Sequence, residues 1–64
     1  MLDLDLPGPW VVDVGKGVTA KYSTRYVFES AYQAIRYYYS IHVHSGGKKR
    51  LLHNGNVVLR EITT

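Results

Sequence analysis

The chain has 64 residues and no cysteine, so one small core has to hold it together without a disulfide. A chain of about this length buries only about 60% of the surface that its unfolded form exposes, which leaves a lone domain marginally stable. A structural zinc site also loses its commonest ligands when cysteine is absent. Self-association is the stabilising device left most open, and we therefore expect a homo-oligomer.

Hydrophobic residues make up 45% of the chain and charged residues 20%, which is typical of a globular protein. We expect a single domain over residues 10–64, preceded by an extended arm over residues 1–9. Three leucines alternate with two aspartates from Leu2 to Leu6, a period of two that predicts a strand. The arm is expected either to cover the edge of its own core or to add a strand to a partner or a second copy.

The start of the chain is acidic and lacks the basic residues and apolar stretch of a signal peptide. The longest stretch without a charged residue, between Arg36 and Lys48, is too short and too polar to span a bilayer. We therefore expect a cytoplasmic protein that makes no membrane contact.

Two strands are predicted over residues 10–14 and 18–28, joined by a Gly-Lys-Gly turn. A three-residue loop places Val14 opposite Val18 and gives the hairpin a single apolar face, whereas a two-residue loop mixes apolar and polar side chains on both faces. The sequence therefore predicts the three-residue loop, with Gly17 at a positive φ angle.

A helix is predicted to begin at Ala31, because Ser30 and Gln33 have the spacing of a capping box. At 100° per residue its apolar stripe contains Ala31, Ala34, Ile35, Tyr38, Ile41 and His42. After the helix, Asn54-Gly55 is the strongest hairpin signal of the chain and predicts a type I′ turn between strands 48–53 and 56–62.

These segments predict an α+β fold of order ββαββ, with an antiparallel sheet packed on one helix. Which face of the last hairpin is buried stays open, because both of its faces carry apolar residues. The predicted core consists of Trp10, Val12, Val14, Val18, Ala20, Tyr22, Phe28, Ala34, Ile35 and Tyr38.

Positive charge gathers in the second half of the chain, where residues 30–64 carry five cations and one acidic residue. In a regular last hairpin Lys49 faces Arg60 and Lys48 faces Glu61. Like charges directly opposite each other are unfavourable unless something neutralises them, so the pair of cations indicates an anionic ligand. Charge reversal at Lys49 and Arg50 is expected to abolish function and leave the fold intact, because exposed charges contribute little to stability. A solvated edge protected from aggregation by charge is the alternative.

The chain has six tyrosines, three of them consecutive from Tyr37 to Tyr39. Helix geometry places Tyr37 outside, Tyr38 in the core and Tyr39 at the margin. An exposed tyrosine beside Arg36 suits base stacking or a protein interface, whereas a tyrosine-rich border of the core is the structural alternative.

Catalysis is not expected, because the sequence has no cysteine nucleophile, no glycine-rich phosphate loop and no Ser, His and acid set at a recognisable spacing. His42, His44 and His53 could supply metal ligands, but His42 also falls on the apolar helical stripe. We therefore predict no metal and no cofactor.

Two hypotheses of function remain. In the first, a non-enzymatic binding module holds a nucleic acid or a nucleotide on a basic surface bordered by tyrosine. In the second, a small inhibitor or adaptor binds a protein through a strand edge or a tyrosine patch, a format also typical of phage accessory proteins. The predicted ligand-binding residues are Lys48, Lys49, Arg50, Arg60, Arg36 and Tyr37.

Overall fold

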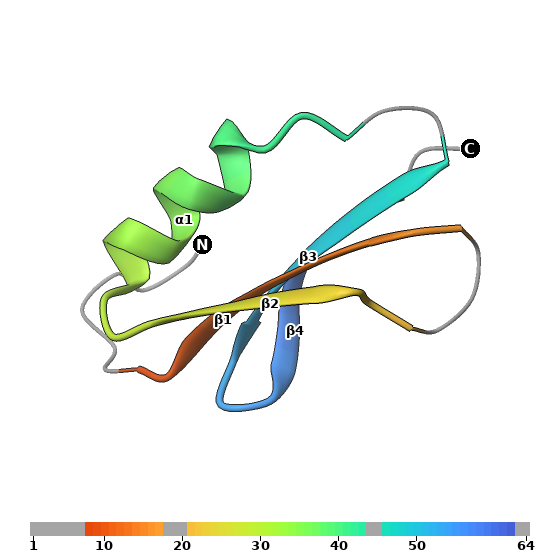
Figure 1. Cartoon of the computed structure of the whole chain (residues 1–64). Coiled ribbons are helices and arrows are strands. Elements are labelled where there is room, and N and C mark those ends of the chain that lie inside the picture. The colour runs from red at the N-terminus through yellow and green to blue at the C-terminus, as the bar shows by residue number, and fades with distance from the viewer. Residues whose placement is uncertain (1–7, 18–20, 44–45, 63–64) are drawn as a thin grey trace.

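A computed structural model describes residues 8–17, 21–43 and 46–62 of the chain. Four strands form one antiparallel sheet in the order β2-β1-β3-β4, with a single helix between the second and third strands in sequence (Figure 1). The predicted ββαββ order is confirmed. The elements are β1 Trp10–Lys16, β2 Thr24–Phe28, α1 Ala31–Ser40, β3 Gly47–His53 and β4 Asn56–Ile62.

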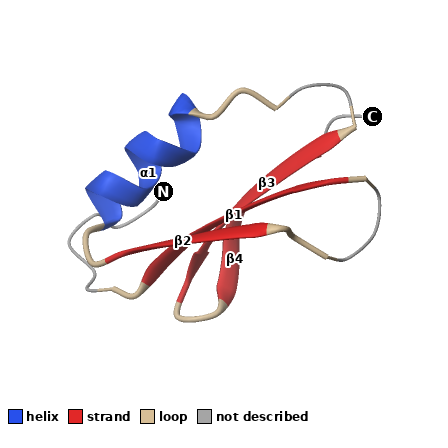
Figure 2. Cartoon of the chain, in the orientation of Figure 1, coloured by secondary structure: helices blue, strands red, loops and turns tan. Residues whose placement is uncertain are grey.

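Helix α1 packs on one face of the sheet, against β1, β2 and β3 (Figure 2). We call this the helix-covered face and the opposite one the open face. Because side chains alternate along each strand, every strand contributes to both faces. The core lies on the helix-covered face and consists of Trp10, Val12 and Leu51 from the sheet and Ala31, Ala34 and Tyr38 from the helix.

The helix begins where the sequence predicts. The Ser30 side chain accepts a hydrogen bond from the backbone N–H of Gln33 at 3.4 Å, which satisfies one of the unpaired donors of the first turn. The helix ends at Ser40, because Ile41 has an extended backbone. His42 was placed on the helical stripe by periodicity, and this is wrong: it follows the helix and is exposed.

The first hairpin has a different register from the predicted one. Trp10 faces Phe28 and Val14 faces Thr24, so the strand partners are shifted by six residues. Tyr22 therefore does not face Trp10, and the connection between the strands is longer than three residues. Because six is an even number, the shift leaves Tyr26 and Phe28 on the same face as Val12 and Trp10, as predicted. The other expected partners, Val18 and Ala20, lie outside the described residues.

The second hairpin has the predicted turn. Asn54 and Gly55 both have positive φ angles, 52° and 83°, as a type I′ turn requires. Next to the turn, Leu52 faces Val57, as a regular hairpin with a two-residue turn requires. A β-bulge between Leu51 and Leu52 then shifts the pairing by one residue. The bulge decides which cations face each other further along the hairpin.

The sequence did not decide which face of this hairpin is buried, and the structure shows that both faces of β3 contain a buried leucine. Leu51 is fully buried on the helix-covered face, while Leu52 is buried on the open face. Strand β3 is thus buried on both faces because it lies inside the sheet, whereas β4 lies at the edge and is mostly exposed.

Candidate functional site

Cross-strand pairing arranges the open face in three rows. One row is apolar and ends at the two edge strands; it consists of Val27, Val11, Leu52 and Val57. The next row is charged and consists of Arg25, Asp13, Arg50 and Arg60. The third contains Gly15, Lys48 and Ile62. The charged row crosses the whole sheet and is the chemically distinctive feature of this face.

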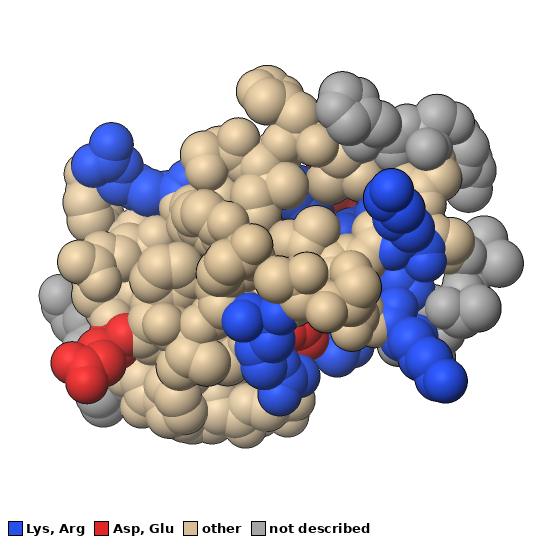
Figure 3. Space-filling model, in the orientation of Figure 1, with Lys and Arg blue, Asp and Glu red and all other residues tan. Residues whose placement is uncertain are grey.

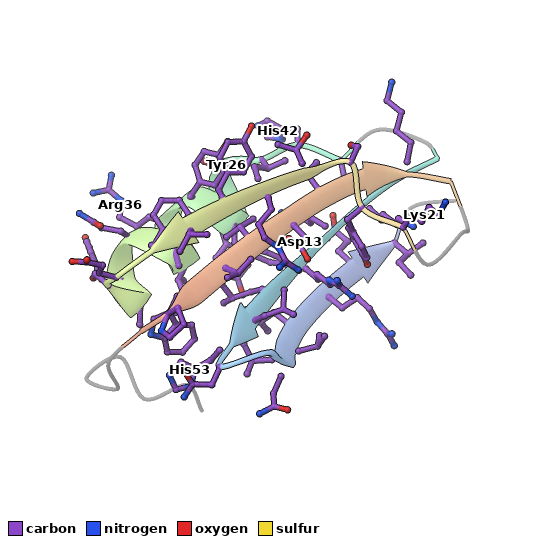
Figure 4. The ribbon with its side chains drawn as sticks, turned by 60° about the horizontal axis from the view of Figure 1, so that its bottom comes forward. Asp13, Lys21, Tyr26, Arg36, His42 and His53 are labelled. Carbon is purple, nitrogen blue, oxygen red and sulfur yellow. The ribbon has the colours of Figure 1, made fainter. Side chains whose placement is uncertain are left out.

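Asp13 anchors the charged row near the middle of the sheet (Figure 4). Arg25 of β2 donates through Nε to Oδ1 at 2.8 Å and through Nη2 to Oδ2 at 3.1 Å. From the other side, Nε of Arg50 donates to Oδ2 at 2.9 Å. The hydrogen bonds from Arg25, followed by those from Arg50, hold the pKa of Asp13 below its usual value, although burial of the carboxylate acts in the opposite direction.

The two guanidinium groups remain accessible to a ligand. The side chain of Arg25 is 59% exposed and that of Arg50 is 26% exposed, whereas the side chain of Asp13 is only 2% exposed. A guanidinium has five N–H donors, and the bidentate contact with Asp13 uses two of those on Arg25. The buried carboxylate therefore orients donors that still face solvent.

The bulge brings Arg60 into this row. Arg50, not Lys49, faces Arg60, and Lys49 faces Glu61. The expected pairs of Lys49 with Arg60 and of Lys48 with Glu61 are therefore wrong, but an opposed pair of cations exists one residue further along β3. Within the described part of the chain, Arg60 is exposed and has no carboxylate within ion-pair distance.

Tyr22 packs over the charged side chains of β3. The guanidinium carbon of Arg50 lies 4.1 Å from the centroid of the Tyr22 ring, and Nζ of Lys48 lies 4.5 Å from it. Gly15 makes this approach possible, since a Cβ atom there would lie 3.0 Å from the Cα of Tyr22. Tyr22 is thus half-buried on the open face and not part of the helix-side core.

Lys49 lies on the helix-covered face and is only 5% exposed. Its Nζ donates to the carbonyl oxygens of Tyr38 and Ile41 at 2.6 and 3.0 Å, which places a cation at the carboxyl end of the helix. Lys48 is also buried, at 2% exposure. The expectation that Lys49 is exposed and dispensable for folding is therefore wrong.

Arg36 and Tyr37 lie on the helix, away from the charged row. In Figure 4, Arg36 lies at the left end of the molecule and Lys21 at the right end, with Asp13 between them near the middle of the sheet. The guanidinium carbon of Arg36 lies 5.6 Å from the centroid of the Tyr32 ring. Tyr37, expected to point outward, is half-buried; a hydrogen bond with Tyr26 raises its pKa.

The two histidines within the described residues lie far apart. His53 stacks on Trp10 with ring centroids 4.1 Å apart, while His42 lies at the opposite side of the molecule (Figure 4). His44 lies outside the described residues. Across residues 8–17, 21–43 and 46–62, no three metal-ligating side chains form a group that could hold a metal ion.

Among the described residues of the strands, cations outnumber carboxylates on the open face. Among the described residues, this face carries four cations, Arg25, Lys48, Arg50 and Arg60, against the single carboxylate of Asp13, a net charge of +3. The whole chain also has a formal charge of +3, because its other four cations equal its other four acidic residues. In the view of Figure 3, basic side chains form separate groups at the upper left, the lower centre and the right, and an acidic side chain stands out at the left.

Asp13 and Arg25 are site residues that the sequence reasoning missed. Their signal was present: Asp13 interrupts an apolar strand, and Arg25 lies on the polar side of the next strand. Testing registers for an ion pair, in addition to a common apolar face, would have brought the two together.

In the part of the chain that the structure describes, no helix has the length and hydropathy needed to cross a membrane. Comparison of the chain with protein-family models, curated proteins and solved structures finds no match.

Proposed function

We propose that the chain is a non-enzymatic binding module that holds a single nucleic-acid strand on the open face of its sheet. The observation that carries this proposal is the charged row, in which a buried aspartate orients two arginines and a third arginine extends the row to the edge. Arginine is suited to this role because its planar fork matches two phosphate oxygens.

A chain of phosphates fits the row better than a single nucleotide does. Neighbouring strands lie about 4.8 Å apart, so the arginines on β2, β3 and β4 spread positive charge over about 15 Å. Tyr22 and the apolar row border these cations on either side. Such a combination of cations with aromatic and apolar surface favours a strand whose bases are unpaired.

The proposal is tested by fluorescence anisotropy with a labelled single-stranded oligonucleotide, titrated at several salt concentrations. The affinity is expected to fall steeply as salt rises, because each phosphate contact releases counterions. Arg60→Gln removes one contact, so the slope of log affinity against log salt should become shallower by about 0.7.

Arg36→Gln is the matched control, because it removes the same charge from the helix, outside the charged row. It should leave the slope unchanged. Failure of the oligonucleotide to bind, or equal losses in the two variants, would contradict a site on the open face. Substitution at Arg60 is preferred to Arg25 or Arg50 because it leaves the hydrogen bonds of Asp13 intact.

Protein binding through a strand edge is the second candidate function. It is favoured by β2, which lies at the edge of the sheet and exposes 65% of the surface of Val27. Binding of this kind would be far less sensitive to salt than binding of nucleic acid.

A further inference from the structure

Strand β2 offers an edge to which another strand can be added. It is the first strand in the sheet order, so only one of its sides pairs with a strand among the described residues. Its exposed side chains include apolar and aromatic ones, with Val27 at 65% and Tyr26 at 39% exposure. An edge of this kind is a template for β-augmentation.

A shallow aromatic groove runs between this edge and the outer side of α1. The ring of Tyr37 packs against Tyr26 and Phe28 of β2, with centroids 4.8 and 5.5 Å apart, and forms one wall. The groove is lined by Phe28, Tyr32, Gln33, Arg36, Tyr37 and Ser40. It can therefore receive apolar side chains on the helix side of an added strand.

The two sides of an added strand would meet different surroundings. Its side chains alternate, so every second one faces the aromatic groove and the others lie on the open face beside Arg25. Apolar residues suit the first set. Acidic residues suit the side chains on the open face, because Arg25 has N–H donors left after its contact with Asp13. Val27, on the same face of β2, is exposed and leaves room for them.

Residues 2–6 of the chain have this pattern, Leu-Asp-Leu-Asp-Leu, and their number equals that of β2. They lie outside the described residues. We propose that Leu2–Leu6 of a second copy pairs as an antiparallel strand with the free edge of β2, with leucines toward the groove and aspartates toward Arg25.

The point at which the described chain begins favours a second copy as the source. Gly8 lies beside the end of β2, since a Cβ atom there would lie 3.0 and 3.2 Å from the carbonyl oxygens of Glu29 and Phe28. Gly8 is thus at the carboxyl end of β2. If the residues that precede Gly8 lay along the β2 strand of their own molecule, the two segments would run in the same direction and pair as parallel strands. Parallel pairing is the less stable arrangement, whereas a segment from another molecule is free to approach antiparallel.

Sedimentation velocity of the full chain tests the proposal through its mass. The wild-type chain is expected to sediment as a dimer or a larger assembly. Replacing Leu2, Leu4 and Leu6 together by serine should weaken association at least about tenfold, because the leucines lose their burial in the groove. Replacing the same three by isoleucine is the matched control and should preserve association, since apolar character and strand propensity are kept.

A second pair of variants tests the edge itself. Val27→Asp places a negative charge where the aspartates are expected and should weaken association, whereas Val27→Lys should preserve or strengthen it. Circular dichroism checks that both variants fold, as expected for a side chain that is so exposed.

A wild-type chain that sediments as a monomer at every concentration measured would overturn the proposal. Equal association of the serine and isoleucine variants, or of the two Val27 variants, would overturn it as well. Arg60→Gln and the leucine variants change different residues, so nucleic-acid binding is judged from Arg60→Gln and association from the leucine variants, and either proposal can fail alone. Val27 belongs to the apolar row of the open face, so its two variants are scored for association only.

Discussion

Asp13 is the most consequential single residue of the open face, because three strands meet at its side chain. It is buried, yet it accepts hydrogen bonds from Arg25 and Arg50 through both carboxylate oxygens. Such a group stabilises the sheet only while it is charged. Without it, the two arginines would face each other across β1 with no anion between them.

Asp13→Asn should therefore lower the free energy of unfolding at neutral pH by about 2 kcal/mol, less than for a fully buried pair because Arg25 is solvated. The pKa of Asp13 is lowered from 3.8 on folding, so its contribution is present above that pH and is lost as pH falls through the lowered value. Urea unfolding of both proteins from pH 7 to pH 2 measures the difference. A gap between them that stays constant down to pH 2 would contradict this assignment.

Lys49 shows how differently neighbouring cations can act. Lys49→Met removes the hydrogen bonds to the carbonyls of Tyr38 and Ile41 and should destabilise the fold by about 2 kcal/mol. Thermal or urea unfolding measures the loss. Lys21→Met is the control, because Lys21 is exposed, and its effect should stay within about 0.5 kcal/mol. Similar stabilities of the two variants would show that the contacts of Lys49 are dispensable.

At the scale of elements, local signals predict the ends of structure well. Asn54-Gly55 fixes a type I′ turn, and Ser30 caps the helix at the predicted residue. Pairing between elements is harder, because several registers bury the same alternating apolar residues. In the first hairpin the ion pair of Asp13 with Arg25 distinguishes the observed register from the predicted one.

The helix cap gives a prediction at this scale. Ser30→Ala should lower stability by about 1 kcal/mol, because the N–H of Gln33 loses its acceptor. Ser30→Asp keeps an acceptor and adds a negative charge at the amino end of the helix, so it should be neutral or stabilising. Chemical denaturation compares the three proteins. A loss in the aspartate variant as large as in the alanine variant would argue against capping.

At the scale of the whole molecule, the sequence predicts the order of elements and most of the helix-side core, because these follow from periodicity and turns. The sequence does not predict which face of the sheet each candidate site residue occupies. Lys48, Lys49 and Arg50 are adjacent in sequence, but Lys49 lies under the helix while the other two lie on the open face. Alternation along β3 places Lys49 on the face opposite to Lys48 and Arg50, but which of the two faces the helix covers is not recorded in any local pattern.

The bulge in the last hairpin has a consequence for how this chain tolerates changes in length. Strand β4 contains one residue more than a regular ladder opposite Leu51 and Leu52 would need. Deleting Val58 would therefore straighten the ladder and still leave Leu59 opposite Leu51 and Arg60 opposite Arg50. Because Val58 is the extra residue of the bulge, deleting it is expected to leave Arg60 on the open face of the sheet.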